Sequence, residues 1–566
     1  MNEMGPQSSV NGEKQSPVEY DVVVVGAGFA GLYSLHRLRE LGFSVRVFEA
    51  ADGVGGTWFW NCYPGARCDV ESMEYSYSFS EELEQEWEWT EKYPSQPEIL
   101  RYINHVADRF DLRRDIQLNT RVTTAEFDED TNGWTVQTDD GARYSAQYCV
   151  MASGCLSAPK DPDFKGLASF TGDWYMTSCW PKEEIDFTGK RVGVIGTGSS
   201  AIQAIPVIAE QADLVTVFQR TPGFSVPAMN KPLDQEFQRQ LKARYREHRI
   251  AARESMFGVP VAMPEKAAME YTPEQQRADL EARWQAGGAA PFMLAFTDSL
   301  IDEQANQVVA EFVRDKIRAT VKDQEVAELL CRQDYPLGTK RLCVDTGYFE
   351  VYNRDNVNLV DIRNAPIEEI TPHGLRTGGV EYEFDVIVFA IGFDAMTGAL
   401  FDIDIHGTDG VALREQWADG PRTYLGLATA GFPNLFMITG PGSPSVLSNM
   451  IVSIEQHVDW IADCLTYMRE RDLTRIEATQ QAQNEWVQHV DEVGQTTLFP
   501  RANSWYVGAN VPGKPRVFMP YVGGVGPYRE TCNAVAEKGY EGFALAGAPA
   551  GGGAHGEPAS LAADAA

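Results

Sequence analysis

The sequence has no run of about 18 consecutive apolar residues, so it predicts no transmembrane helix. Its N-terminal segment, MNEMGPQSSVNGEKQSPVEY, lacks the apolar core of a signal peptide, and we therefore expect a cytoplasmic protein. The nine cysteines show no paired spacing typical of metal ligands. In a cytosolic protein of this size we expect such cysteines to be reduced and mostly buried, and we expect no bound metal.

Lysine and arginine are scarce relative to the acidic residues, 48 against 81, which gives a net charge of -33. Such a surface repels nucleic acid and anionic membranes, so we expect neither as a partner and predict a small substrate without strong negative charge. Hydrophobic residues make up 43% and charged residues 23%, which is typical of globular proteins. A chain of 566 residues exceeds the size of one hydrophobic core, so we expect two or three domains.

The segment DVVVVGAGFAGL, residues 21–32, has the pattern of a dinucleotide-binding turn. A valine-rich strand leads into Gly26, Gly28 and Gly31 in the spacing GxGxxG, and a helical repeat of leucines follows. The next predicted strand, SVRVFEA, has Glu49 at its end. The glycines let the backbone approach a pyrophosphate at the helix N-terminus, and a carboxylate at this position accepts hydrogen bonds from a ribose hydroxyl. The whole pattern predicts a Rossmann unit.

A second segment, KRVGVIGTGSSA, repeats this pattern with Gly196, Gly198 and Ala201. Alanine is an accepted third residue of the motif. The strand that follows ends in Arg220 and Thr221, where the first unit has a carboxylate. A cation there favours the 2′-phosphate of NADP over the free ribose of NAD. The alternative is that this arginine is only a solvated surface residue.

Two such units predict an α/β fold with two Rossmann-like dinucleotide-binding domains, the first for FAD and the second for NADP. Between them lies a charged, helical stretch that we interpret as an insert in the NADP domain. This insert either only packs against the domain or forms a wall over the substrate site. The predicted boundaries are a disordered N-terminus 1–18, FAD domain 19–155 and 385–544, NADP domain 156–232 and 331–384, helical insert 233–330, and a disordered tail 545–566.

The segment FTGDWYMTSCWP resembles the fingerprint of type I Baeyer–Villiger monooxygenases, FxGxxxHxxxWP. Phe170, Gly172, Trp180 and Pro181 match it, and Met176 stands where the family has histidine. The segment GGTWFWNCYPGARCD resembles GGxWxxxxYPGxxxD of the same family, and sibling N-oxygenating monooxygenases lack most of it. The resemblance covers residues 20–543 and is greatest to the phenylacetone and steroid monooxygenase branch.

The resemblance implies that NADPH reduces FAD, that oxygen then gives a peroxyflavin, and that this species attacks a hydrophobic ketone to yield an ester or lactone. Such a reaction needs a fixed cation that keeps the peroxyflavin anionic and stabilises the negative charge of the adduct. Arg341 matches the catalytic arginine of the family, and Asp69 matches its carboxylate partner. Arginine suits this role because it does not lose its proton near neutral pH. The alternative is that the pair is a surface salt bridge that contributes little to stability.

The resemblance also implies binding residues. The resemblance places the substrate pocket at Ser445, Val446, Leu447 and Met450. For the last three of these residues, packing in the core is an alternative. Trp505 matches a tryptophan that closes on NADP and substrate. The residues expected at FAD are Gly26, Gly28, Phe29, Gly31, Glu49, Thr57, Trp58, Asp69, Tyr75 and Val122, with Arg341 beside the flavin. Those expected at NADP are Gly196, Thr197, Gly198, Ser199, Ser200, Ala201, Gln203, Arg220, Thr221 and Lys340.

Three positions depart from the family pattern. Met176 replaces the fingerprint histidine at the hinge between the domains, so we expect altered coupling and retained chemistry. Cys62 stands where many relatives have arginine, and Ile391 where the sequence ATG is usual. The expected substrate is a cyclic, aryl or steroid-like ketone, and the expected assembly is a monomer or weak homo-oligomer. The alternatives are an N- or S-oxygenating flavin monooxygenase, an uncoupled NADPH oxidase, and a non-catalytic nucleotide sensor.

Overall fold

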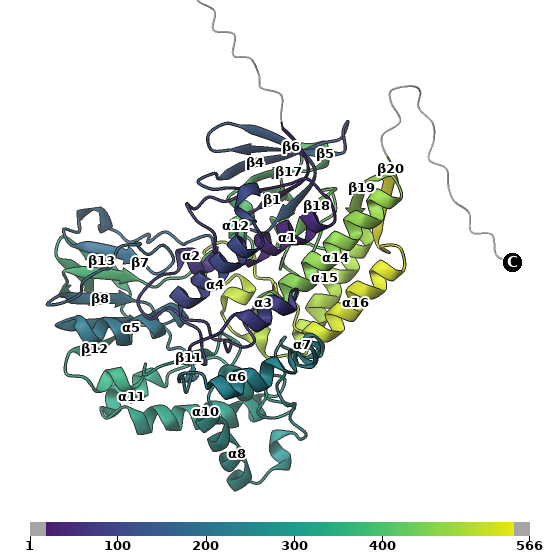
Figure 1. Cartoon of the computed structure of the whole chain (residues 1–566). Coiled ribbons are helices and arrows are strands. Elements are labelled where there is room, and N and C mark those ends of the chain that lie inside the picture. Colours follow the sequence, from purple (N-terminus) through teal and green to yellow (C-terminus); the bar gives the residue numbers. More distant parts are fainter. Residues whose placement is uncertain (1–17, 548–566) are drawn as a thin grey trace, which may run out of the picture.

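A computed structural model describes residues 18–547 of the chain (Figure 1). The two predicted disordered segments lie outside this range except at their inner edges, where Val18 begins β1 and Leu545–Gly547 end β20. Within residues 18–547, no helix combines the length and apolarity needed to cross a bilayer. All nine cysteines are free thiols, and only Cys62 and Cys179 are not buried.

The first sheet has eight strands in the order β17-β4-β5-β6-β1-β2-β3, with β18 paired to β6. Its central strand β1 runs parallel to β2 and β6, and the four valines at positions 22–25 are buried on both faces, as is typical of parallel sheets. The strands are β1 (Val18–Val25), β2 (Val45–Phe48), β3 (Ile116–Gln117), β4 (Val122–Asp128), β5 (Gly133–Thr138), β6 (Arg143–Met151), β17 (Asp404–His406) and β18 (Leu435–Met437).

Helices of the first module cover the sheet around β1. Helix α1 follows β1 directly and packs against α14, which in turn packs against α16 (Figure 1). A long helix such as α14 is buried over most of its length because it lies between α1 and α16. The elements of this layer are α1 (Phe29–Glu40), α2 (Thr57–Trp60), α3 (Glu81–Glu86), α4 (Gln96–Arg109), α12 (Gly398–Phe401), α13 (Leu413–Gln416), α14 (Met450–Glu470), β19 (Leu473–Ala478), α15 (Gln480–Gln495), α16 (Val525–Glu537) and β20 (Phe543–Gly547).

The second sheet is parallel throughout and has five strands in the order β12-β9-β8-β16-β7. Helix α5 follows β8 and packs on it through alanine and isoleucine side chains. The sheet and its helix comprise β7 (Asp173–Met176), β8 (Arg191–Ile195), α5 (Ser199–Gln211), β9 (Leu214–Gln219), β12 (Val357–Asp361) and β16 (Val386–Phe389). Two small sheets accompany it, one of β10 (Ser225–Pro227) and β11 (Cys343–Asp345), the other of β13 (Ile367–Thr371), β14 (Gly374–Thr377) and β15 (Val380–Glu383).

The strand Val386–Phe389 corrects one predicted boundary. We expected the chain to re-enter the FAD domain at residue 385, but this strand pairs with β8 and β7 in the second sheet. The chain returns to the first sheet only after it, at β17 and β18. The boundary at 385 therefore falls one strand too early.

The helical insert contacts both modules. Leu241 and Tyr245, from α6 and α7, are buried in the core under the first sheet, whereas Val309 and Val313 from α10 are buried in the core of the second. Thr272 caps α8 with the reciprocal hydrogen bonds of a capping box, in agreement with its sequence. The helices are α6 (Gln235–Lys242), α7 (Tyr245–Glu254), α8 (Pro273–Ala286), α9 (Ala289–Met293), α10 (Glu303–Thr320) and α11 (Gln324–Leu330).

Two chain segments connect the modules and lie side by side. Pro159 of the outgoing segment forms a β-bridge with Phe393 of the returning one. The Asp394 N–H donates to the Ala158 carbonyl at 2.9 Å, and the Met396 N–H donates to the Cys155 carbonyl at 2.7 Å. We call this pair of segments, residues 155–160 and 392–396, the hinge ribbon.

Candidate active site

Arg341 and Asp69 form a two-pronged ion pair between the modules. The arginine lies just before β11. The aspartate follows residues 63–67 of the first module, which we call the YPGAR loop after their sequence. Nε donates to Oδ2 and Nη2 donates to Oδ1, both at 2.7 Å. The side chains are 34% and 22% exposed, respectively. Parallel, charge-assisted hydrogen bonds of this kind fix the plane of the guanidinium as well as its position.

The electrostatics keep both partners charged. Burial alone would raise the pKa of Asp69, but the charge and hydrogen bonds of Arg341 outweigh burial and hold this pKa below its usual value. Burial would likewise lower the pKa of Arg341, and Asp69 reverses that effect and raises it. The site therefore presents a permanent cation at any physiological pH.

The third donor of Arg341 faces the predicted substrate pocket. Nη1 donates to the Val446 carbonyl at 2.8 Å. Val446 lies in the short 3-10 helix η6 (Ser445–Leu447), directly before α14. On another side is Tyr506, whose pKa burial raises to about 12 although the arginine beside it opposes the shift. The ring of Tyr506 lies 4.2 Å from that of Trp505, in η8 (Trp505–Val507).

Apolar side chains from the first module, the hinge ribbon and the insert gather at this point. Val446, Leu447, Met450 and Trp505 belong to one hydrophobic cluster. Three insert side chains join the same cluster, so the insert lies beside the predicted substrate residues and also packs in the two cores. The insert residues in the cluster are Phe257, Met293 and Leu300.

The first glycine turn has the shape that a pyrophosphate needs. Gly28 caps α1 without any side-chain hydrogen bond, so the first N–H groups of the helix are free to bind an anion. A Cβ on Gly28 would lie 3.4 Å from the Cα of Gly56, so the two glycine-containing turns lie close together. Gly26 has φ +104°, and a Cβ on Gly31 would meet the Gly26 carbonyl oxygen at 1.8 Å.

Glu49 is buried at the end of β2. Its two oxygens accept hydrogen bonds from the Ala27 and Ala51 N–H groups, at 2.7 and 2.9 Å. Because each carboxylate oxygen accepts two hydrogen bonds, capacity for a ribose hydroxyl remains. These features fit a dinucleotide at the first turn.

The other residues expected at FAD divide into two groups. Phe29 contacts the ring of Tyr75, with centroids 5.5 Å apart, and Trp58 Nε1 donates to Tyr75 Oη at 3.0 Å. Thr57 begins α2 beside them and is exposed. Val122, in contrast, is the first residue of β4 and is buried in a separate hydrophobic cluster.

The second glycine turn is open. Gly196 has φ +116°, and a Cβ on Gly198 would meet nothing within 4 Å, so a ligand has access to the start of α5. Thr197 Oγ1 donates to the Thr221 carbonyl at 2.8 Å, and Ser199 Oγ lies 3.1 Å from Cys343 Sγ. Ser200 and Ala201 continue the first turn of α5. The turn therefore fits a second dinucleotide.

The side chain of Gln203 is directed at the first module. Its Oε1 accepts from Tyr63 Oη at 2.8 Å, and its Nε2 donates to the Arg67 carbonyl at 3.0 Å. The amide thus docks the YPGAR loop onto α5. An NADP contact by Gln203 would have to use the remaining hydrogen-bonding capacity of this residue.

Three cations converge beyond the second turn. Arg220 and Arg363 follow the ends of the neighbouring parallel strands β9 and β12, and Arg363 Nε donates to the Arg220 carbonyl at 3.4 Å. Burial lowers the pKa of Lys340, and the charges of Arg220 and Arg363 lower it further. The sequence did not indicate Arg363, because this residue becomes a neighbour of Arg220 only through the pairing of β9 and β12.

Removing two of these charges tests the arrangement. The double variant Arg220→Gln, Arg363→Gln is expected to lower kcat/KM for NADPH about tenfold and leave that for NADH nearly unchanged, because charge-assisted hydrogen bonds to phosphate are lost. Steady-state kinetics with both nucleotides measure the effect. Arg143→Gln is the control, since this exposed arginine lies in the first sheet and pairs with Glu126 at 3.4 Å. Equal losses with both nucleotides would contradict the assignment.

The three departures from the family pattern lie around the hinge. Met176 in β7 pairs with Phe389 of β16, and its side chain packs on the same apolar cluster as Ile391. Cys62 Sγ lies 3.5 Å from the Trp180 carbonyl oxygen. Met176 and Ile391 therefore pack within the second module, and Cys62 contacts Trp180 across the modules. The hydrogen bonds between Arg341 and Asp69 involve none of the three.

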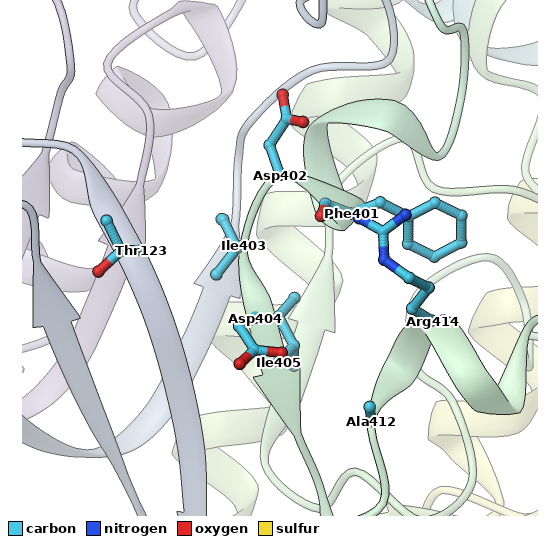
Figure 2. Close-up of a pocket in the computed structure, with 8 residues that line it drawn as sticks. All are labelled: Thr123, Phe401, Asp402, Ile403, Asp404, Ile405, Ala412 and Arg414. Carbon is cyan, nitrogen blue, oxygen red and sulfur yellow. Dashed lines mark hydrogen bonds between the residues drawn. The ribbon is translucent and has the colours of Figure 1, made fainter.

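A surface cavity of about 200 Å³ lies elsewhere, beside β17 at the edge of the first sheet (Figure 2). The guanidinium of Arg414 lies against the ring of Phe401, 4.8 Å from its centroid. The cavity contains none of the predicted site residues, so it is not the place of the chemistry. Its lining is Thr123, Phe401, Asp402, Ile403, Asp404, Ile405, Ala412 and Arg414.

Comparison with known proteins agrees with this geometry. Residues 23–282 match the family model of pyridine nucleotide-disulphide oxidoreductases. The acetone monooxygenase (methyl acetate-forming) of Gordonia sp. (strain TY-5) is 44% identical over 94% of this chain and 100% of its own. A solved structure of an oxidized steroid monooxygenase bound to NADP is 54% identical, with TM-score 0.90, and covers 94% of this chain and 100% of its own. The phenazine N-monooxygenase of Lysobacter antibioticus is 40% identical over 96% and 98% of the two chains.

These similarities span both modules and the insert, so the relationship extends well beyond a shared nucleotide-binding turn. They confirm the predicted fold class, the resemblance and the cofactors FAD and NADP. The chain therefore belongs to the type I Baeyer–Villiger monooxygenases, the FAD- and NADPH-dependent flavoenzymes that convert ketones to esters or lactones.

Proposed function

We propose that this enzyme inserts one oxygen atom of O2 beside the carbonyl of a hydrophobic ketone, with Arg341 as catalytic residue and Asp69 as its orienting partner. The observation that carries the proposal is the ion pair of these residues, which faces the apolar cluster at Val446. A fixed cation is required where negative charge develops on the ketone oxygen. Asp69 holds the guanidinium so that little reorganisation is needed at the moment of reaction.

The bound cofactors supply the electrons of NADPH and the oxygen-activating flavin. The chain's own residues bind and orient them. Free N–H groups at the start of α1 support a role for the first glycine turn at the FAD pyrophosphate, and Glu49 at its ribose. The remaining residues proposed for FAD are Phe29, Thr57, Trp58, Tyr75 and Val122.

For NADP, the open turn at Gly198 supports pyrophosphate binding, and the cations Arg220, Lys340 and Arg363 support binding of the 2′-phosphate. We propose that Trp505 closes on the nucleotide. Its segment is fastened to the hinge ribbon, since Lys160 Nζ donates to the Asn510 carbonyl at 2.7 Å. The remaining residues proposed for NADP are Gly196, Thr197, Ser199, Ser200, Ala201, Gln203 and Thr221.

The substrate is proposed to be a bulky cyclic, aryl or steroid-like ketone held against Ser445, Val446, Leu447 and Met450. Two facts support this: the cluster around Arg341 is apolar, and a steroid monooxygenase shares 54% of the sequence. The test is a panel of alkyl, aryl, cyclic and steroid ketones with NADPH and O2, with product mass as readout. A gain of one oxygen as an ester is expected, and no gain across the panel would contradict the proposal.

A second candidate is N- or S-oxygenation, because a phenazine N-monooxygenase is 40% identical over nearly the whole chain. It is tested by adding a phenazine, a tertiary amine and a sulfide to the panel. Measuring hydrogen peroxide in the same reactions tests the other alternative, an uncoupled NADPH oxidase. Peroxide equal to the NADPH consumed with every substrate would favour that oxidase.

We also propose that the enzyme is cytoplasmic and a monomer or weak homo-oligomer. The net charge of -33 supports weak or no self-association, since like-charged surfaces repel each other. Light scattering coupled to size exclusion measures the mass, and a stable tetramer at micromolar concentration would contradict the proposal.

The variant Met176→His is expected to raise the ester formed per NADPH consumed, by at most about tenfold, since a single hydrogen bond regained at the hinge is worth about 1 kcal/mol. Product and NADPH are measured together for one ketone. Met176→Leu is the control because it keeps an apolar side chain on the cluster of β7. If the histidine variant has the same ratio as the wild type, Met176 is neutral.

A further inference from the structure

His457 is completely buried in α14, behind the turn that carries the predicted substrate residues. Its Nδ1 accepts a hydrogen bond from the Thr439 N–H at 2.9 Å, and its Nε2 lies 3.0 Å from Tyr528 Oη. Tyr528 in turn donates to the Leu425 carbonyl at 2.5 Å. The two ring nitrogens of His457 therefore connect the loop at Thr439 to Tyr528 of α16, and Tyr528 extends the connection to the loop at Leu425.

The tautomer of His457 follows from these partners. The Thr439 N–H can only donate, so Nδ1 carries no proton and the ring hydrogen lies on Nε2. Nε2 then donates to Tyr528 Oη, whose own hydrogen goes to Leu425. Burial lowers the pKa of His457 to about 3, so the imidazole stays neutral and the network keeps its direction at physiological pH.

The network holds three strained backbone positions. Leu425, Thr439 and Ser445 have φ values of +58°, +54° and +41°, in the left-handed region that non-glycine residues rarely adopt. Such positions persist only where the surroundings hold them. Here Tyr528 holds Leu425, His457 holds Thr439, and Ser445 Oγ donates to the Thr439 carbonyl at 3.1 Å.

The chain of contacts ends at Arg341. Ser445 is followed directly by Val446, whose carbonyl accepts the hydrogen bond from Arg341 Nη1. We propose that His457 is a positioning residue for the reaction: through Thr439 and Ser445 it sets the place of the Val446 carbonyl, and thereby the third hydrogen bond of Arg341. The inference rests on the proposed role of Arg341.

Two substitutions separate the ring nitrogens. His457→Asn leaves an amide oxygen near the place of Nδ1 and keeps an acceptor for Thr439, whereas His457→Gln extends past it toward Tyr528. We expect the asparagine variant to retain the wild-type yield of ester per NADPH within about twofold, and the glutamine variant to lose about tenfold, the equivalent of one hydrogen bond. FAD content and the rate of flavin reduction by NADPH are expected to be unchanged in both.

A crystal structure of each variant supplies a readout independent of turnover. The distance from Arg341 Nη1 to the Val446 carbonyl oxygen, 2.8 Å here, is expected to persist in His457→Asn and to lengthen in His457→Gln. Tyr528→Phe keeps the bond between His457 and Thr439, so it is expected to behave like His457→Asn. If Tyr528→Phe instead behaves like His457→Gln, positioning does not run through Thr439 and the proposal is wrong.

Equal losses of ester yield in both His457 variants, in step with their melting temperatures, would assign His457 a general structural role and overturn the inference. Unchanged yields in both would also overturn it. A wild-type enzyme that forms no ester from any ketone is a different failure, that of the proposed function. Ester formation by the wild type together with unaffected variants therefore contradicts this inference alone.

Discussion

Replacing Arg341 with methionine is expected to lower ester formation by about 10³-fold, the upper range for loss of a donor that stabilises an oxyanion. The reason is that the guanidinium of Arg341 lies against the apolar cluster at Val446, and methionine fills similar space without charge. Consumption of NADPH is expected to continue, with hydrogen peroxide as the product. The measurement is ester, peroxide and NADPH in one reaction.

Arg354→Met is the matched control, because this arginine is exposed and follows a 3-10 helix outside the apolar cluster. It should retain wild-type yield and stability. A second comparison, Arg341→Lys, keeps the charge but cannot make both hydrogen bonds to Asp69. Full activity of the lysine variant would show that charge alone suffices, and full activity of the methionine variant would remove Arg341 from the mechanism.

Replacing Asp69 with asparagine is expected to lower ester yield about 10²-fold, since a partly buried guanidinium loses its charge-assisted partner and its fixed orientation. The site remains cationic, so the effect should be smaller than that of Arg341→Met. Stopped-flow measurement of flavin reduction separates this loss from a defect in NADPH use. Equal ester yields in Asp69→Asn and the wild type would contradict an orienting role.

The pH dependence of the pair follows from the direction of the Asp69 shift. Arg341 lowers the pKa of Asp69 below its ordinary value of 3.8, so the stabilisation by the ion pair is present above that value and is lost as pH falls through the lower folded-state pKa. Between pH 5 and 8 the wild type should show no change in activity that arises from Asp69. Any step that Asp69→Asn removes in this range would contradict the assignment.

Local pattern was sufficient to predict the nucleotide-binding turns. Gly31 must be glycine because of a contact only five residues back along the chain, and Glu49 is found by counting one strand beyond the helix. The fold class followed because two such units recur. Arg341 and Asp69, in contrast, are far apart in sequence, and only the family resemblance connected them before the structure brought them within hydrogen-bonding distance.

What the sequence left undetermined depends on which strands and loops become neighbours. The strand Val386–Phe389 reads as buried from its residues, but nothing local indicates that β8 and β7 are its partners. Arg363 becomes a neighbour of Arg220 only because β9 and β12 pair. The His457 network likewise joins segments that become neighbours only in the tertiary fold, so no sequence motif predicts it.

The hinge ribbon gives the two modules a preferred axis of rotation. Two strands that are hydrogen-bonded side by side bend readily out of their common plane, whereas bending within that plane would stretch one strand and compress the other. We therefore expect relative motion of the modules to be a rocking about the width of the ribbon, with little shear. Asp394 in the ribbon also binds Lys514 of the Trp505 segment, so we expect that segment to follow a rocking of the ribbon.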